Sequence, residues 1–200
     1  MAKEAPREPG AELRSTEILS QARYPLETYE IAQRRRDGSE QTVTREVYRV
    51  GEGAAVLLHD PLRGSVVLVR QFRAAPFVNG DRAVLAEVCA GVVERGDTPE
   101  ETVRKEAEQE TGFRLRDPRH VFTLYPSPGA TSEKLHLFTA LYDPTDRAGP
   151  GGGEPGEGED IEVLELSLDD AWAMVGAGEI TDAKTVLLLQ HLRLERAGTP

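Results

Sequence analysis

The chain has 200 residues, a length that fits one large domain and can bury a core without disulfides or a structural metal. A composition that is 38% hydrophobic and 30% charged excludes a chain that is disordered throughout. The formal charge of -11 would repel a nucleic-acid backbone, and no basic cluster offsets it, so we expect no nucleic-acid partner.

The N-terminal part of the chain has few structural signals. Residues 1–15 hold prolines and a glycine among charged residues without apolar periodicity, which predicts a disordered tail. The stretch Arg-Arg-Arg-Asp-Gly at residues 34–38 is typical of a polar hairpin turn. Partial alternation of apolar and polar residues predicts a strand over residues 42–50.

The remainder of the chain carries stronger patterns and no internal repeat. Its apolar runs predict strands at residues 54–59, 65–69, 84–93, 121–124, 135–142 and 161–166, and helices at residues 169–175 and 183–194. The Pro and Gly of residues 60–64 predict a β-hairpin between the first two strands. Residues 147–160 are too rich in Gly and Pro for regular structure.

The cysteine content and the N-terminus indicate the compartment. Cys89 is the one cysteine, so it has no disulfide partner within the chain, and its small apolar neighbours predict a buried residue rather than a catalytic thiol. The first ten residues lack the apolar core of a signal peptide, and no later run reaches membrane-spanning length. We therefore expect a cytoplasmic protein without a membrane partner.

Residues 91–113 form the most informative segment. Thr98 is a good N-cap, Pro99 suits the first helical position, and Glu101 completes a capping box with Thr98. Gly112 supplies a left-handed helix stop. The segment therefore predicts a helix that begins after Thr98 and ends before Gly112.

Two acidic residues on this helix are candidate metal ligands. Glu106 and Glu110 are four residues apart, so both carboxylates project from one face. Hard oxygen ligands of this kind match Mg²⁺ or Mn²⁺. Spacing alone favours the simpler interpretation, an exposed acidic helix with ordinary ion pairs such as Glu100 with Arg104.

The whole string from Gly91 to Phe113 resembles the Nudix box, in which a glycine, a loop, a capped helix and a second glycine stand in a set register. The positions that match it are Gly91, Glu106, Glu110 and Gly112, and residues of like charge stand at Asp97 and Lys105. Gln109 departs from the pattern, which has an acid there. The spacing matches throughout, so the chain is identified as a member of the Nudix family.

The resemblance extends over about residues 18–192. The segments at residues 69–73, 125–129 and 159–162 resemble the ADP-ribose pyrophosphatase branch. The GDP-mannose pyrophosphatase group is most similar, at residues 45–48, 78–80, 178–180 and 184–187.

The resemblance implies an α/β fold, a Nudix α/β/α sandwich with a mixed central sheet and a small N-terminal β-sheet used in dimerisation. The implied organisation is a disordered tail at residues 1–15, an N-terminal β region at residues 16–50 that is exchanged across a homodimer, and a Nudix hydrolase domain at residues 51–196.

The resemblance also implies a metal shell and a base. By position, Mg²⁺, or Mn²⁺ in its place, would be held by the backbone carbonyl of Ala90 and the carboxylates of Glu106, Glu110 and Glu159. Gln109 leaves the number of ions open. The general base of similar enzymes lies on a mobile acidic loop, where Glu157 is the first candidate and Glu154 the substitute.

Substrate contacts follow in the same way. Arg73 matches the position that grips the diphosphate, a task that suits its planar fork, although a surface ion pair is the alternative. Positions that contact nucleotide or sugar correspond to Arg45, Glu46, Gly91, Glu133 and Lys184.

The implied activity is Mg²⁺-dependent hydrolysis of a nucleoside diphosphate sugar, of the GDP-mannose or ADP-ribose class, to nucleoside monophosphate and sugar phosphate. One alternative is a non-catalytic Nudix module that binds nucleotide as a sensor, motivated by Gln109 and Asp97. Another is a Nudix hydrolase of a different nucleoside diphosphate derivative.

Overall fold

The chain forms two compact units, described here from a computed structural model that covers residues 10–154, 156 and 158–198. One unit comprises Met1–Gly51 and Tyr125–Glu133. The other comprises Glu52–Leu124 and Lys134–Pro200. We call them the N-terminal unit and the sandwich unit.

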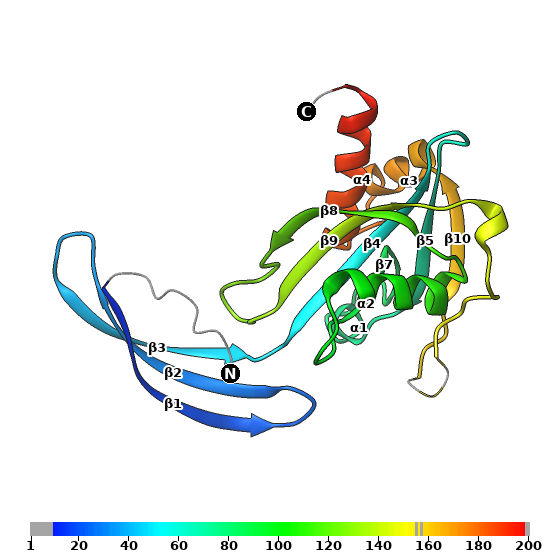
Figure 1. Cartoon of the computed structure of the whole chain (residues 1–200). Helices are drawn as coiled ribbons and strands as arrows, with labels where there is room; N and C mark the ends of the chain where they lie inside the picture. The colour runs from blue at the N-terminus through cyan, green and yellow to red at the C-terminus, as the bar shows by residue number, and fades with distance from the viewer. Residues whose placement is uncertain (1–9, 155, 157, 199–200) are drawn as a thin grey trace. The chain divides into compact units, whose positions relative to one another are not determined.

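The N-terminal unit is an antiparallel sheet in the order β1-β2-β3, visible in blue in Figure 1. Its strands are β1 (Ala11–Gln21), β2 (Pro25–Arg34) and β3 (Glu40–Tyr48). The turn predicted at residues 34–38 joins β2 to β3, with Gly38 at a φ of 87°. Strand β1 begins at Ala11, so the expectation of a disordered tail is wrong for residues 11–15, and the first nine residues of that tail lie outside the described part of the chain. Pairing with β2 orders residues that carry no apolar pattern of their own.

A distant segment completes the N-terminal unit. The backbone N–H of Tyr48 donates to Ala130 at 2.9 Å, and that of Ser132 donates to the Tyr48 carbonyl at 3.0 Å. The Ser132 hydroxyl donates to the Val50 carbonyl at 2.6 Å. Residues 125–133 are thereby tied to the end of β3.

The sandwich unit is built on a seven-stranded sheet, which is mixed, as predicted. Its main order is β10 (Glu162–Ser167), β5 (Ser65–Phe72), β4 (Glu52–Asp60), β9 (Lys134–Leu141) and β8 (Arg116–Leu124), while β6 (Val84–Glu87) pairs with β5 and β7 (Cys89–Val92) pairs with β4. Strands β4 and β9 run parallel and the other pairs antiparallel.

The strand predicted at residues 84–93 is divided in two. The break falls at Val88, whose backbone N–H donates to the Thr185 hydroxyl at 2.8 Å instead of to a neighbouring strand. The two halves pair with different partners, β6 with β5 and β7 with β4. The apolar run predicted the extended backbone but not this change of partner, which depends on a residue 97 positions away.

Helices cover both faces of the sheet (Figure 1). Helix α2 (Pro99–Glu106) and the π-helical turn η1 (Ala107–Thr111) pack on one face, and α3 (Leu168–Gly176) and α4 (Ala183–Arg196) pack on the other. The short elements are α1 (Ala74–Val78) and the 3-10 turn η2 (Pro144–Asp146). The predicted α/β/α arrangement is confirmed.

The middle of strand β4, residues 54–58, is apolar without interruption, and the packing of the sheet explains why. Ala55 and Leu57 pack toward α3 and α4, whereas Ala54, Val56 and Leu58 pack toward α2. Successive side chains point to opposite faces of a sheet, so a strand covered on both sides needs apolar residues at every position.

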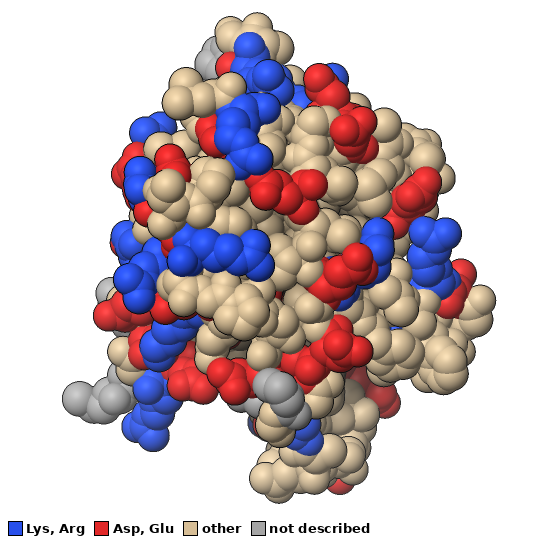
Figure 2. All heavy atoms as spheres, turned by 90° about the vertical axis from the view of Figure 1, so that its right-hand side faces the viewer, with Lys and Arg blue, Asp and Glu red and all other residues tan. Residues whose placement is uncertain are grey.

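The surface is mixed in charge. Figure 2 shows acidic and basic side chains intermingled on the face that it displays. Across the described part of the chain, every helix is too short or too polar to cross a lipid bilayer.

We predict that Leu57→Ala lowers the free energy of unfolding by about 2–5 kcal/mol, because it removes buried methyl groups and leaves a cavity at the centre of the sheet. The matched control is Leu62→Ala in the β4–β5 turn, where Leu62 is 96% exposed and the change should stay within about 0.5 kcal/mol. Urea denaturation followed by circular dichroism measures both. Equal losses for the two variants would contradict the packing described.

Candidate active site

The helix that carries the two candidate metal ligands changes its pitch along its length. The capping box at Thr98 and Glu101 is present as predicted, and α2 runs to Glu106. From Ala107 to Thr111 the backbone is π-helical instead of α-helical, and this departs from the expectation of a regular helix. The Thr111 hydroxyl donates to the Ala107 carbonyl, four residues earlier, and such side-chain competition perturbs helix geometry. Short π turns of this kind are frequent at functional sites.

Gly112 ends the helix in the left-handed conformation, at a φ of 76°. It has a second reason to be glycine, since a Cβ there would lie 2.3 Å from the carbonyl oxygen of Gly149. The chain at Gly149 therefore crosses directly over the helix end. Any larger residue at Gly112 would displace that crossing.

The Gly-rich segment of residues 147–160 is held by the carbonyls that the helix end leaves without intrahelical partners. Backbone N–H groups donate from Ala148 to Gly112 at 2.7 Å, from Gly152 to Glu110 at 2.9 Å and from Gly153 to Gln109 at 3.1 Å. Gln109 thus helps to hold the Gly-rich segment through its backbone carbonyl, and this bond does not depend on the Gln109 side chain. These bonds hold the residues just before Glu154 against the end of the helix.

Glu106 and Glu110 both lie against strand β7. A Cβ on Gly91 would fall 1.9 Å from Oε1 of Glu106, so this carboxylate occupies the space that a side chain at Gly91 would need. The backbone N–H of Ala90 donates to Oε2 of Glu110 at 3.2 Å. The structure therefore brings together four of the predicted site residues, Ala90, Gly91, Glu106 and Glu110.

The electrostatics of this group are unfavourable for carboxylates without a cation. Burial raises the pKa of Glu110 to about 7, and the charges of Glu106 and Glu159 add to the rise, while hydrogen bonds from Cys89 and Ala90 oppose it. Burial and the nearby Glu110 also raise the pKa of Cys89 well above its ordinary value. Cys89 is therefore a neutral, buried thiol, as predicted, and not a nucleophile.

Glu159 is near the pair but has a partner of its own. Its Oε2 accepts a hydrogen bond from the Glu154 backbone at 2.9 Å. Within residues 10–154, 156 and 158–198, no three His, Cys, Asp or Glu side chains converge closely enough to hold a metal ion. Glu154 is exposed, and Glu157, the first candidate for the base, lies outside the described residues.

Arg73 and Lys184 meet at a buried acid that the sequence did not single out, Glu87. Arg73 donates to it twice, from Nε at 2.8 Å and from Nη2 at 3.0 Å, and Lys184 Nζ donates at 2.6 Å. Glu87 is 2% exposed. The signal in the sequence was one charged residue inside the apolar run Val84–Val93, where an acid must have a partner to be buried.

The pKa values agree with this pairing. Burial alone would raise the pKa of Glu87, but Arg73 and Lys184 outweigh it and hold the pKa below its ordinary value. Burial alone would lower the pKa of Arg73, but Glu87 outweighs it, and the charge of Glu110 also reaches this guanidinium. The cluster is therefore ionised, and its Arg73 lies within electrostatic range of Glu110.

The other predicted contact residues belong to the N-terminal unit. Arg45 and Glu46 are exposed on β3, and Arg45 donates to the neighbouring Thr44 carbonyl at 2.8 Å. Glu133 is partly buried at the end of residues 125–133.

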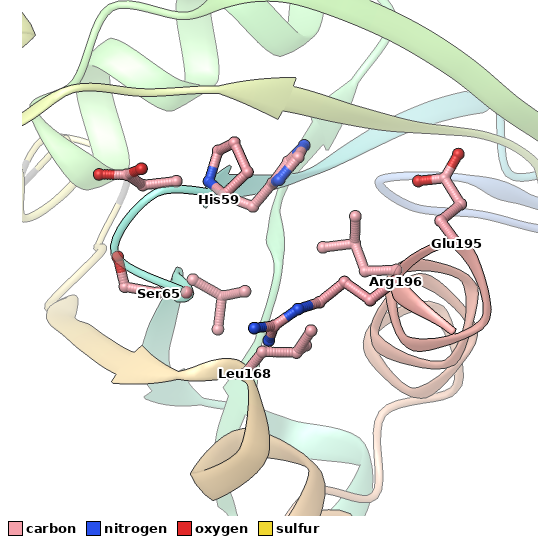
Figure 3. A pocket seen from close by; sticks show the side chains of 10 residues that line it. His59, Ser65, Leu168, Glu195 and Arg196 are labelled. Carbon is pink, nitrogen blue, oxygen red and sulfur yellow. The ribbon is translucent and has the colours of Figure 1, made fainter. Parts of the chain in front are cut away.

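A cavity of about 240 Å³ lies elsewhere in the sandwich unit, between the β4–β5 turn, the start of α3 and the end of α4 (Figure 3). The Arg196 side chain extends across it toward Leu168, and His59 of β4 and Ser65 of β5 also line it. None of the predicted site residues lines this cavity.

Family models match almost the whole chain. The NUDIX domain matches residues 50–191. The GDP-mannose pyrophosphatase NudK N-terminal domain matches residues 11–48.

Similar proteins agree with these matches. A GDP-mannose pyrophosphatase from Cronobacter sakazakii (strain ATCC BAA-894) is 50% identical over 186 residues, which cover 92% of this chain and 95% of the relative. Another, from Shigella flexneri serotype 5b (strain 8401), is 47% identical over 180 residues, which cover 88% and 92%. A solved structure, "Crystal structure of ADP compounds hydrolase", has a TM-score of 0.73, covers 98% of this chain and 100% of its own, and is 16% identical, so it supports the fold alone.

We predict that, in a chelating buffer, the unfolding free energy of the metal-free protein falls as the pH rises from about 4.5 to above 7. The folded chain keeps a proton on Glu110 that the unfolded chain releases near the ordinary pKa of 4.5, so this stability is complete below that pH and is lost through about pH 7. The loss relative to Glu110→Gln should be on the order of 1–3 kcal/mol. Urea titrations at several pH values measure it, and parallel pH profiles for the two proteins would refute it.

Proposed function

The chain belongs to the Nudix family, and we propose that it hydrolyses the diphosphate bond of a nucleoside diphosphate sugar to nucleoside monophosphate and sugar phosphate. GDP-mannose is the first candidate and ADP-ribose the second. The observation that carries the proposal is the placement of Glu106 and Glu110 against the backbone of Ala90 and Gly91, in a chain half identical to a GDP-mannose pyrophosphatase.

The acidic pair suits a divalent cation. Two carboxylates, one of them with its pKa raised to about 7 by burial and like charges, form a hard oxygen donor set whose repulsion a cation would relieve. We assign Glu106, Glu110 and the Ala90 carbonyl to Mg²⁺, with Mn²⁺ as the substitute. We propose that Glu159 joins them when the ion binds, because in the structure its carboxylate accepts from the Glu154 backbone and the three acids, all among the described residues, do not converge. The bound ion would neutralise the diphosphate and polarise its phosphorus–oxygen bonds.

Hydrolysis also requires a group that binds the diphosphate and a base that activates water, and we assign both roles to side chains of this protein. Arg73 is positioned by Glu87 and keeps N–H groups with which to bind a phosphate oxygen. A water in line with the phosphorus must lose a proton to a positioned base. We assign that role to Glu157 and keep Glu154 as the substitute. Glu154 directly follows the residues of the Gly-rich segment that are bonded to the helix end, and Glu157 is three residues further along the sequence.

We propose further that the protein is a cytoplasmic homodimer. No described residue of β1, β2 or β3 is buried, and β1 exposes Leu13, Ile18 and Leu19. A three-stranded sheet without a core of its own gains stability when an apolar face is covered, and a second copy of the chain is the partner we assign. A single-chain mass by light scattering would refute the dimer.

The hydrolase proposal predicts turnover of GDP-mannose or ADP-ribose with Mg²⁺, measured by monophosphate release over a nucleotide-sugar panel. Glu106→Gln should reduce the rate on the order of 100-fold or more, because the side chain serves the metal and not the core. The control is Glu108→Gln, an exposed acid on the same helical segment that pairs with Arg114, which should keep full activity. Nucleotide binding without turnover of any panel member would favour a sensor.

The base assignment predicts that Glu157→Gln lowers kcat on the order of 100-fold while leaving the Mg²⁺ concentration for half activity nearly unchanged, because a base acts on water and not on the ion. Steady-state rates over a Mg²⁺ series measure both quantities. Glu154→Gln is the matched variant on the same loop. If only Glu154→Gln lowers kcat, the base is Glu154.

A further inference from the structure

Glu87 lies at the end of β6 and is a hydrogen-bond acceptor for two cations at once. Both of its oxygens accept from the Arg73 guanidinium, and Oε2 accepts again from Lys184. With a side chain that is 2% exposed, it has no access to solvent that could replace these donors. A single buried carboxylate therefore contacts both cationic groups.

The two cations retain donors that Glu87 does not use. A guanidinium has five N–H groups, of which Arg73 uses two on Glu87, and no other side-chain bond from Arg73 is found among the described residues. An ammonium has three, of which Lys184 uses one on Glu87 and one on Asp182 at 2.7 Å. Both groups can thus bind an oxyanion without releasing Glu87.

The surroundings make the cluster rigid. Asp182 caps α4, accepting from the Thr185 backbone at 3.0 Å as well as from Lys184. The Thr185 hydroxyl in turn accepts from Val88, the residue after Glu87. Lys184 is held from two sides and is 14% exposed, which leaves its ammonium little freedom.

The net charge of the cluster distinguishes two roles for Glu87, neutralising the cations or determining their positions. Arg73 and Lys184 carry two positive charges, and Glu87 and Asp182 carry two negative charges, so the cluster is close to neutral. If Glu87 only neutralised charge, its removal would strengthen the attraction of the cations for an anion. If Glu87 determined their geometry, its removal would weaken anion binding, because flexible cations lose freedom on binding.

We propose that Glu87 is a positioning residue that holds Arg73 and Lys184 as a preformed clamp for the diphosphate of the substrate. This inference rests on the proposed function, in which Arg73 and Lys184 contact the nucleotide sugar. Glu87 itself does not contact the substrate.

The test is Glu87→Gln, which keeps the shape of the side chain and removes its charge. We expect KM for the nucleotide sugar to rise on the order of 10-fold, with a smaller change in kcat. The variant weakens the charged hydrogen bonds that hold Arg73 and Lys184 in place, and these two groups bind the substrate before the chemical step. The control is Asp169→Asn, which removes an exposed carboxylate from an ion pair with Arg193 in the same unit and should leave KM unchanged. A KM that stays constant or falls in Glu87→Gln overturns the proposal.

A double-mutant cycle shows whether Glu87 acts through Arg73. In the Arg73→Ala background, Glu87→Gln should change KM by clearly less than in the wild-type background, because the group that it positions is gone. A purely structural role would lower the unfolding midpoint and leave the two effects on KM additive. Additive effects would overturn the inference.

Binding measurements separate this inference from the hydrolase proposal. Calorimetry with GDP and Mg²⁺ should give a Kd that Glu87→Gln raises on the order of 10-fold. A wild-type chain that binds GDP but hydrolyses no nucleotide sugar would refute the hydrolase proposal. The effect of Glu87→Gln on the Kd for GDP would still test the clamp. No binding of GDP by the wild-type chain would overturn the clamp.

If Glu87→Gln does not fold, Glu87→Asp serves in its place. Aspartate keeps the charge but withdraws the carboxylate by one methylene, so it cannot meet both cations in their present positions. We expect the Kd for GDP to rise here as well, and a wild-type Kd would overturn the proposal.

Discussion

The arrangement of this site depends on the close contact between the end of the helix formed by α2 and η1 and the backbone of strand β7 at Ala90 and Gly91. Glu106 lies in the space that a side chain on Gly91 would fill, and Glu110 accepts a hydrogen bond from Ala90. Gly112 permits a second close approach, by the chain at Gly149. Strand β7 and the chain at Gly149 can both approach the helix end closely because a glycine stands at each of the two contact points, Gly91 and Gly112.

Two buried glutamates in this unit have opposite pKa shifts. Glu87 and Glu110 are each 2% exposed. Arg73 and Lys184 hold the pKa of Glu87 below its ordinary value, whereas burial and like charges raise that of Glu110 to about 7. Burial penalises a charge unless a partner offsets the penalty, so the first acid is satisfied within the chain and the second is suited to a ligand of positive charge.

The sequence determined the features that depend on neighbouring residues. The capping box at Thr98, the left-handed stop at Gly112 and the β4–β5 hairpin all follow from local rules of backbone geometry, and each is present. The resemblance to the Nudix box, and not the helical spacing, implied that Glu106 and Glu110 share a site with Gly91. The capping box, the helix stop, the hairpin and the strand at the apolar run of β4 were predicted from the residues themselves. These predictions succeed because the interacting residues are close in sequence or follow a helical or strand period.

The tertiary structure decided what depends on residues far apart in the chain. Only the fold brings Glu87 between Arg73 and Lys184, divides the run at residues 84–93 through a bond to Thr185, and orders β1 from Ala11 by pairing it with β2. The same holds for the Gly-rich segment, whose composition predicted no regular structure but whose N–H groups meet the helix-end carbonyls. A sequence gives the residue types available for such bonds. Which distant partners meet is settled by packing, because each buried donor and acceptor must be satisfied by whatever the folded chain places beside it.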